Sequence, residues 1–202
     1  MPSVLYIHGF NSSPASHKAR QLVSCMNHLG RKHELRVPEL KNDASLAMAQ
    51  LEDAIEALGH PLLVGSSLGG YYATVLAERH GLKAILINPA VMPWQYIDAY
   101  LGPQTNHYTG ERWILTETHV RALAALEVPA PRDASRYQVW LQTGDETLDY
   151  RQAEAYYRDC TLCIEDGGDH GFTGFHTWLP RLLSFAGYEP SLWRDTDFSL
   201  FE

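Results

Sequence analysis

Short apolar runs alternate with longer segments of helical periodicity along most of this chain. Runs rich in β-formers that stop at glycine, asparagine or proline predict buried parallel strands. They lie at 4–7, 34–37, 62–64, 84–88, 137–142 and 161–164. Apolar stripes with capping residues predict helices at about 14–29, 44–58, 68–80, 150–159 and 175–185. Six strands alternating with helices predict an α/β fold with a doubly wound, mostly parallel six-stranded sheet.

The alternation is interrupted between residues 92 and 131. This stretch is rich in aromatic residues and proline and contains no clean strand pattern. It is too long for a bare loop in a compact domain, so we expect it to form helices of its own. The length of 202 residues then predicts one domain, residues 1–202, with 92–131 as a helical insertion or lid. The pattern gives no position for the segment after Gly187.

Charge and composition narrow the classes of partner. The formal net charge is −8 and no basic block occurs, which argues against nucleic acid or an anionic membrane as the main partner. No apolar stretch has the length of a membrane span, and the first residues lack a signal-peptide pattern, so we expect a cytoplasmic protein. Cys160 and Cys163 share an apparent strand and point to opposite faces. Together with Cys25 they are expected to be buried free thiols, with no metal site.

The segment Gly65-Ser66-Ser67-Leu68-Gly69 has the G-x-S-x-G pattern between a strand and a helix. The turn must be sharp to lift the Ser67 hydroxyl clear of the sheet, and side chains at 65 and 69 would collide with neighbouring backbone. The N-terminus of the following helix points free N–H groups towards the place where negative charge would develop. Ser67 is therefore the candidate nucleophile.

A serine nucleophile needs a base, and the base needs a carboxylate that orients it. In parallel sheets, ligand sites lie beyond the carboxyl ends of the strands. His170 lies in a glycine-rich turn directly after the last strand, and Asp145 follows the strand 137–142. The order Ser67, Asp145, His170 is the order typical of this nucleophile pattern. Asp145 is preferred as the orienting carboxylate, and Asp149 is the main alternative.

The developing oxyanion needs two donors. The backbone N–H of Leu68, directly after the nucleophile, is the first candidate. The second is expected from the loop after the first strand, with Phe10 preferred and Asn11 next. Gly9 allows that backbone to come close, and His8 is expected to shape the loop through hydrogen bonds.

The whole set of motifs resembles one family. The segments are 8–14 (HGFNSSP), 65–73 (GSSLGGYYA), 88–90 (NPA), 108–110 (YTG), 143–146 with 149–153 (TGDE, DYRQA), and 168–175 (GDHGFTGF). Together they look like the YqiA/YcfP family of small bacterial α/β-hydrolase-fold proteins, regarded as esterases. The resemblance implies a compact hydrolase without the first two strands of that fold and a Ser67–Asp145–His170 triad. It also implies activity on carboxylic esters or acyl-CoA thioesters.

The aromatic residues of the insertion have two possible roles. Trp94, Tyr100, Tyr108 and Trp113 either line an acyl pocket or pack the insertion onto the body of the protein. A short or medium acyl chain is preferred. No metal cluster, phosphate loop or dinucleotide fingerprint appears in the sequence, so no cofactor is expected.

These observations favour a serine esterase that hydrolyses a small-molecule ester or thioester through an acyl-enzyme. The alternatives are a non-catalytic binding module with the same fold and an acyltransferase that uses the same three residues. The physiological substrate, the chain-length preference and the oligomeric state are not indicated by the sequence.

Overall fold

The computed structural model describes residues 2–202. Its main sheet has six strands in the order β2-β1-β3-β4-β7-β8, and every neighbouring pair is parallel. This confirms the predicted α/β sheet. The strands are β1 (Val4–Ile7), β2 (Leu35–Arg36), β3 (Leu62–Ser66), β4 (Ala84–Ile87), β7 (Tyr137–Gln142) and β8 (Thr161–Glu165).

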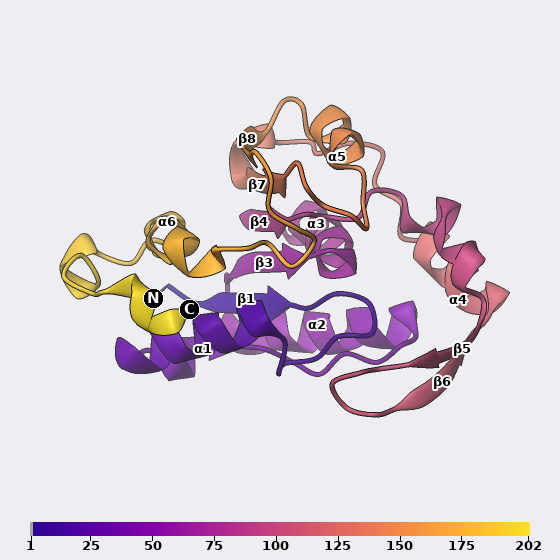
Figure 1. The fold of residues 1–202 in the computed structure, drawn as a ribbon, viewed down its shortest axis with the longest axis horizontal. Coiled ribbons are helices and arrows are strands. Elements are labelled where there is room, and N and C mark those ends of the chain that lie inside the picture. The colour runs from indigo at the N-terminus through magenta and orange to yellow at the C-terminus, as the bar shows by residue number, and fades with distance from the viewer. Residues whose placement is uncertain (1) are drawn as a thin grey trace.

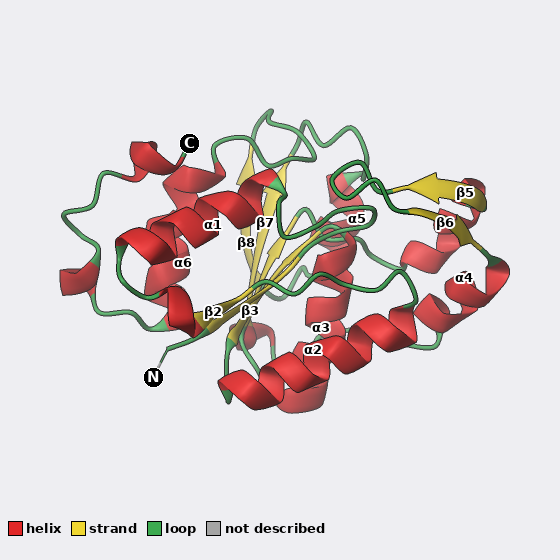
Figure 2. Cartoon of the chain, turned by 90° about the horizontal axis from the view of Figure 1, so that it is seen from below, coloured by secondary structure: helices red, strands yellow, loops and turns green. Residues whose placement is uncertain are grey.

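Helices cover both faces of the sheet (Figures 1 and 2). They are α1 (His17–His28), α2 (Ala44–Leu58), α3 (Leu68–His80), α4 (Glu117–Ala124), α5 (Tyr150–Tyr156) and α6 (Leu179–Ala186). Figure 2 shows α1 and α6 on one side of the sheet and α2, α3 and α5 on the other. The protein is therefore a three-layer sandwich of helices, sheet and helices.

Alternate residues of each strand face the two helical layers. In β1, Leu5 and Ile7 pack with residues of α2 and α3, whereas Val4 and Tyr6 pack with residues of α1 and α6. Successive side chains of a strand point to opposite faces, so a strand buried on both sides must be apolar throughout. This requirement explains why the strands could be recognised as continuous apolar runs.

Some predicted boundaries were wrong. The first helix begins at His17, three residues after Pro14, because Ser13 closes a turn instead of starting the helix. The backbone N–H of Ser16 donates to the Ser13 carbonyl, and that of Ala15 donates to the Ser13 hydroxyl. The predicted last helix begins as a 3₁₀ turn, Phe175–Trp178, that leads into α6.

The insertion contains strands, contrary to the expectation of helices alone. Between β4 and β7 lie two 3₁₀ turns, Pro93–Gln95 and Ile97–Tyr100, then an antiparallel hairpin and α4. The hairpin strands are β5 (Gly102–Thr105) and β6 (Arg112–Leu115). They are short and half-exposed, so they lack the apolar run that marked the central strands. In Figure 1 the hairpin extends from the edge of the body below α4.

The segment after Gly187 packs on the layer that contains α1. It forms two 3₁₀ turns, Pro190–Leu192 and Phe198–Phe201. Phe201 is buried, and its ring lies edge-on to His28 of α1 at 5.6 Å. Within residues 2–202, no helix combines the length and the apolarity needed to cross a membrane.

Candidate active site

Ser67 occupies a strained turn between β3 and α3. Its φ of 56° and ψ of −123° are rarely adopted by residues other than glycine. A Cβ at Gly65 would lie 2.3 Å from the Gly69 carbonyl oxygen, and one at Gly69 would lie 2.0 Å from the Ile7 carbonyl oxygen. The prediction that both positions require glycine is confirmed. The closely packed backbone holds the Ser67 hydroxyl above the sheet.

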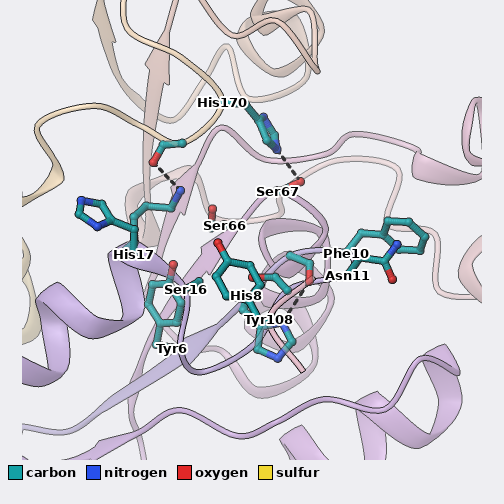
Figure 3. A pocket seen from close by; sticks show the side chains of 14 residues that line it. Tyr6, His8, Phe10, Asn11, Ser16, His17, Ser66, Ser67, Tyr108 and His170 are labelled. Atoms are coloured by element: carbon teal, nitrogen blue, oxygen red, sulfur yellow. Dashed lines mark hydrogen bonds between the residues drawn. The ribbon is translucent and has the colours of Figure 1, made fainter. Parts of the chain in front are cut away.

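His170 lies between Ser67 and Asp145. Its Nε2 is 3.0 Å from the Ser67 Oγ, and its Nδ1 is 2.9 and 2.8 Å from the two Asp145 carboxylate oxygens. Figure 3 shows the His170 ring and the Ser67 hydroxyl pointing towards each other. The Asp145 side chain is 1% exposed, so its charge acts on the imidazole with little screening by water. The three side chains form one hydrogen-bonded series.

The structure shows which of the two candidate carboxylates, Asp145 or Asp149, contacts His170. Asp145 is held by the backbone N–H groups of Thr147 and Leu148, at 2.9 and 2.8 Å. Asp149 is the N-cap of α5 and accepts a hydrogen bond from the Arg151 N–H, with its side chain 49% exposed. Of these two carboxylates, only that of Asp145 contacts His170.

The backbone around His170 is also fixed. The His170 N–H donates to the Glu146 carboxylate at 3.0 Å, which lowers the pKa of Glu146. Gln142, at the end of β7, accepts from the Asp169 N–H and donates to the Thr173 carbonyl. The loop is therefore held on both sides of the imidazole.

The predicted oxyanion donors border the nucleophile. Within residues 2–202, the N–H groups of Phe10 and Leu68 donate no hydrogen bond, so both are available to a ligand. The loop containing Phe10 is shaped by His8, as expected, because His8 Nδ1 donates to the Gly9 carbonyl and Nε2 accepts from the Leu40 N–H. These two bonds define a neutral imidazole, and burial lowers the pKa of His8.

Two pockets meet at Ser67, Phe10 and His170. One, of about 230 Å³, is here called the apolar pocket and is lined further by Ala90, Pro93, Tyr96, Ile97, Tyr100 and Leu148. The other, of about 240 Å³, is called the polar pocket and is lined further by Tyr6, Ser12, Ser16, Lys18, Ser66 and Tyr108 (Figure 3). A substrate attacked by Ser67 therefore borders two spaces, and the second is more polar than the first.

The four aromatic residues expected at an acyl pocket lie in different environments. Tyr100 lines the apolar pocket and Tyr108 the polar pocket. Trp94 packs edge-on against Tyr71 of α3. Trp113 packs edge-on against Phe10, and its Nε1 donates to the Asn11 side chain at 2.9 Å. Neither tryptophan lines one of these two pockets.

The chain matches a known family over most of its length. A family model described as an uncharacterised protein family, UPF0227, covers residues 3–187. The chain belongs to the UPF0227 family. This confirms the resemblance to the YqiA/YcfP family. A UPF0227 protein from Shewanella sp. (strain MR-4) is 33% identical over 193 residues, covering 90% of this chain and 98% of the relative. A UPF0227 protein from Serratia proteamaculans (strain 568) is 23% identical over 186 residues, with 90% and 97% covered.

Solved structures with low sequence identity share the fold of this UPF0227 chain. Est1E from Butyrivibrio proteoclasticus with bound ferulic acid superposes with a TM-score of 0.69 at 14% identity, covering 91% of this chain and 86% of Est1E. Mouse alpha/beta hydrolase domain-containing protein 10 gives 0.69 at 15% identity, covering 91% and 90%. A monoacylglycerol lipase from Paleococcus ferrophilus gives 0.66 at 13% identity, covering 92% and 94%. The UPF0227 chain therefore has the α/β-hydrolase fold.

Several pocket residues of this UPF0227 protein were missed by sequence reasoning. Tyr96, Ile97, Thr147 and Leu148 also line the apolar pocket, and Lys18 lies in the polar one. Tyr96 and Ile97 lie within the aromatic insertion, and their position there could have identified them as pocket residues. The side chain of Lys18 reaches the pocket from the first turn of α1, and nothing in the local pattern indicated this.

The described part of the chain, residues 2–202, contains no cluster of His, Cys, Asp and Glu with the geometry of a metal site. Its three cysteines are free thiols. Cys25 is buried as expected, whereas Cys160 and Cys163 are only partly buried. They do not share a strand as expected, because β8 begins at Thr161, although they do pack against opposite faces of the sheet. Burial raises the pKa of Cys25 to about 12 and that of Cys160 to about 11, so neither is a ready nucleophile at neutral pH.

Proposed function

We propose that this UPF0227 protein is a serine hydrolase that cleaves carboxylic esters or thioesters with short or medium acyl chains. The observation that carries the proposal is the hydrogen-bonded series from Ser67 Oγ through the His170 ring to Asp145, with separations of 2.8 to 3.0 Å. Such a series activates a serine hydroxyl, which is a weak nucleophile alone.

The chemistry follows from this arrangement. Ser67 Oγ attacks the carbonyl carbon of the ester while His170 Nε2 takes its proton. When the tetrahedral intermediate collapses, the bond to the leaving oxygen or sulfur breaks and His170 returns the proton to that atom. Water then attacks the acyl-enzyme by the same proton transfers, which releases the acid and regenerates Ser67.

Two further features support this chemistry. Asp145 is buried and negative, so it favours the imidazolium that forms in each transition state and keeps the proton of neutral His170 on Nδ1. The N–H groups of Phe10 and Leu68 border the place where the oxyanion would develop, at the N-terminus of α3. Backbone donors of this kind contribute about 3 kcal/mol or more to transition-state stabilisation.

The apolar pocket is the better fit for the acyl half of the substrate. Its volume of about 230 Å³ and its lining by Ile97, Leu148 and Tyr96 favour a short or medium hydrocarbon chain. Two structural relatives agree with a carboxylic-ester substrate: Est1E holds ferulic acid, a carboxylic acid, and the Paleococcus ferrophilus protein is named a monoacylglycerol lipase.

A fluorophosphonate probe and a panel of 4-nitrophenyl esters and acyl-CoA thioesters test the proposal. We expect mass spectrometry to find the probe on Ser67, and Ser67→Ala to lose both labelling and turnover. Ser45→Ala, an exposed serine on α2, is the control and should retain both. Wild-type protein that neither reacts with the probe nor cleaves any ester would contradict the proposal and favour a binding module. Transfer of the acyl group to an added alcohol in preference to water would instead indicate an acyltransferase.

A further inference from the structure

Lys18 is an unusual component of the polar pocket. It belongs to the first turn of α1, and the residue is only 9% exposed. Its Nζ donates one hydrogen bond, of 2.7 Å, to the carbonyl of Gly171, directly after His170. Within residues 2–202 it forms no ion pair with a carboxylate. An ammonium group has three donors, so two remain for another acceptor.

A buried cation with one neutral acceptor is costly unless an anion balances it. Burial lowers the pKa of Lys18 to about 8, while Asp169 and Asp145 act in the opposite direction. Both carboxylates are engaged elsewhere: Asp169 accepts from the Thr173 hydroxyl at 2.8 Å, and Asp145 holds His170. The positive charge at neutral pH is therefore present but incompletely compensated by the protein.

The surroundings of Lys18 also suit an anion. No carboxylate side chain lines the polar pocket, whereas hydroxyl groups of Tyr6, Ser66 and Tyr108 do (Figure 3). Ser16, the N-cap residue of α1, is buried in the pocket wall. Within residues 2–202 its hydroxyl does not cap the helix and has no partner at ordinary hydrogen-bond geometry, although it lies close to the Tyr6 hydroxyl. The first turn of α1 contains no acidic residue, so its N–H groups and positive dipole end are not neutralised locally.

We propose that the polar pocket binds an anionic oxyacid group, a carboxylate or a phosphate, carried by the alcohol or thiol half of the substrate. This inference rests on the proposed ester hydrolysis, because it assigns the two pockets beside Ser67 to the two halves of one ester. The apolar pocket receives the acyl chain, and Lys18 receives the charge of the leaving group. The protein would then select anionic esters over neutral esters of equal size.

A matched pair of substrates measures this selection. The esters 4-carboxyphenyl butyrate and 4-carbamoylphenyl butyrate have the same acyl group and nearly the same shape but differ in charge. We expect wild-type kcat/KM to be about tenfold higher for the carboxylate, because charge-assisted hydrogen bonds are about twice as strong as neutral ones. In Lys18→Met and Lys18→Gln this ratio should fall to about one, while Lys32→Met, an exposed lysine, should keep the wild-type ratio.

The ratio separates charge recognition from anchoring of the His170 loop. If Lys18 only holds Gly171, the Lys18 variants lose activity equally on both esters. The ratio of their kcat/KM values for the two esters then stays at the wild-type value, which would overturn the proposal. A wild-type ratio near one would also overturn it, although hydrolysis itself would stand. The wild-type protein could instead prefer 4-nitrophenyl hemisuccinate over 4-nitrophenyl butyrate while showing no preference for 4-carboxyphenyl butyrate. That result would place the anion on the acyl half of the substrate and contradict the assignment of the pockets.

Binding without turnover distinguishes failure of this inference from failure of the proposed function. In Ser67→Ala, calorimetry should detect 4-hydroxybenzoate or phenyl phosphate binding at least about tenfold more tightly than 4-hydroxybenzamide. The stronger of the two anions identifies carboxylate or phosphate as the preferred group. If the double variant Ser67→Ala, Lys18→Met binds the anions no more tightly than 4-hydroxybenzamide, the anion site is supported even for a protein with no esterase activity. Equal binding of all three probes would overturn it.

Discussion

The side-chain amide of Asn88 joins the end of β4 to the backbone of Asp169. Its Nδ2 donates to the Asp169 carbonyl at 3.0 Å, and its Oδ1 accepts from the Gln142 N–H at 3.0 Å. Asn88 has a φ of 40°, a left-handed conformation that asparagine tolerates better than most residues. One buried amide therefore sets the height of the His170 loop above the sheet.

Asn88→Asp tests this positioning role. Aspartate keeps the backbone conformation and the acceptor for Gln142 but loses the donor and faces the Asp169 carbonyl with a charge. We expect kcat to fall about tenfold to a hundredfold with little change in KM, together with a loss of about 1–3 kcal/mol in unfolding free energy. Steady-state kinetics and urea titration measure both. A variant that loses stability alone, with kcat unchanged, would limit Asn88 to a structural role.

The carboxylate that orients His170 can be identified by two matched variants. Asp145→Asn removes the charge beside Nδ1 and favours the wrong tautomer, so we expect kcat to fall about a thousandfold or more with the fold intact. Asp149→Asn keeps a good N-cap for α5 and should change kcat little. Circular dichroism checks folding in both variants. The reverse order of effects would identify Asp149 as the orienting residue.

The sequence predicted the sheet because each central strand is apolar on both faces, which leaves an unmistakable run of residues. It also predicted that Ser67, Asp145 and His170 lie together, since each follows a parallel strand within a few residues and the carboxyl ends of such strands share one edge. It favoured Asp145 over Asp149 but did not decide between them. Both follow β7 within a few residues, and the choice depends on the turn formed by the Thr147 and Leu148 N–H groups.

The pockets were harder to predict, because their walls come from segments far apart in the chain. Tyr100 and Trp94 lie six residues apart in one insertion, yet one lines the apolar pocket and the other packs on Tyr71. Lys18 faces the polar pocket only because α1 begins at His17 and directs its first turn towards Gly171. Such contacts depend on tertiary packing, which local periodicity does not encode.

Buried neutral His8 predicts a pH dependence of stability. Burial lowers the pKa of His8, while the hydrogen bond to Gly9 and the charge of Glu39 oppose this change. Below about pH 6.5 the unfolded chain binds a proton that the folded protein does not, so stability falls as the pH decreases, until the folded pKa is reached. The loss is at most about 1.4 kcal/mol per pH unit. His8→Gln retains an acceptor for the Leu40 N–H but cannot titrate.

Urea titrations at about pH 7.5 and about pH 5.5 measure this effect. The wild-type protein should lose more unfolding free energy between the two pH values than His8→Gln does, and the difference is the contribution of His8. Other titrating groups affect both proteins alike and cancel in the comparison. Equal losses in the two proteins would show that His8 titrates in the folded state as it does in the unfolded chain.

The apolar pocket predicts how kcat/KM depends on the length of the acyl chain. Each buried methylene contributes about 0.8 kcal/mol, so wild-type kcat/KM should rise roughly threefold to fourfold per added CH₂ until the apolar pocket is full. Tyr100→Ala removes part of the pocket wall and should flatten this rise or move the optimum, with little change on acetyl esters.

Trp94→Ala and Trp113→Ala are the matched controls for chain length. Both tryptophans support the insertion from outside the pockets, through Tyr71 and through Phe10 with Asn11. Their loss should lower activity on every chain length by a similar factor and reduce stability by about 3–5 kcal/mol or less, given their partial exposure. Profiles over acetyl to decanoyl esters distinguish the two behaviours. If Tyr100→Ala also gives a profile parallel to that of the wild type, the apolar pocket does not hold the acyl chain. Tyr100, Trp94 and Trp113 would then serve only to pack the insertion onto the sheet.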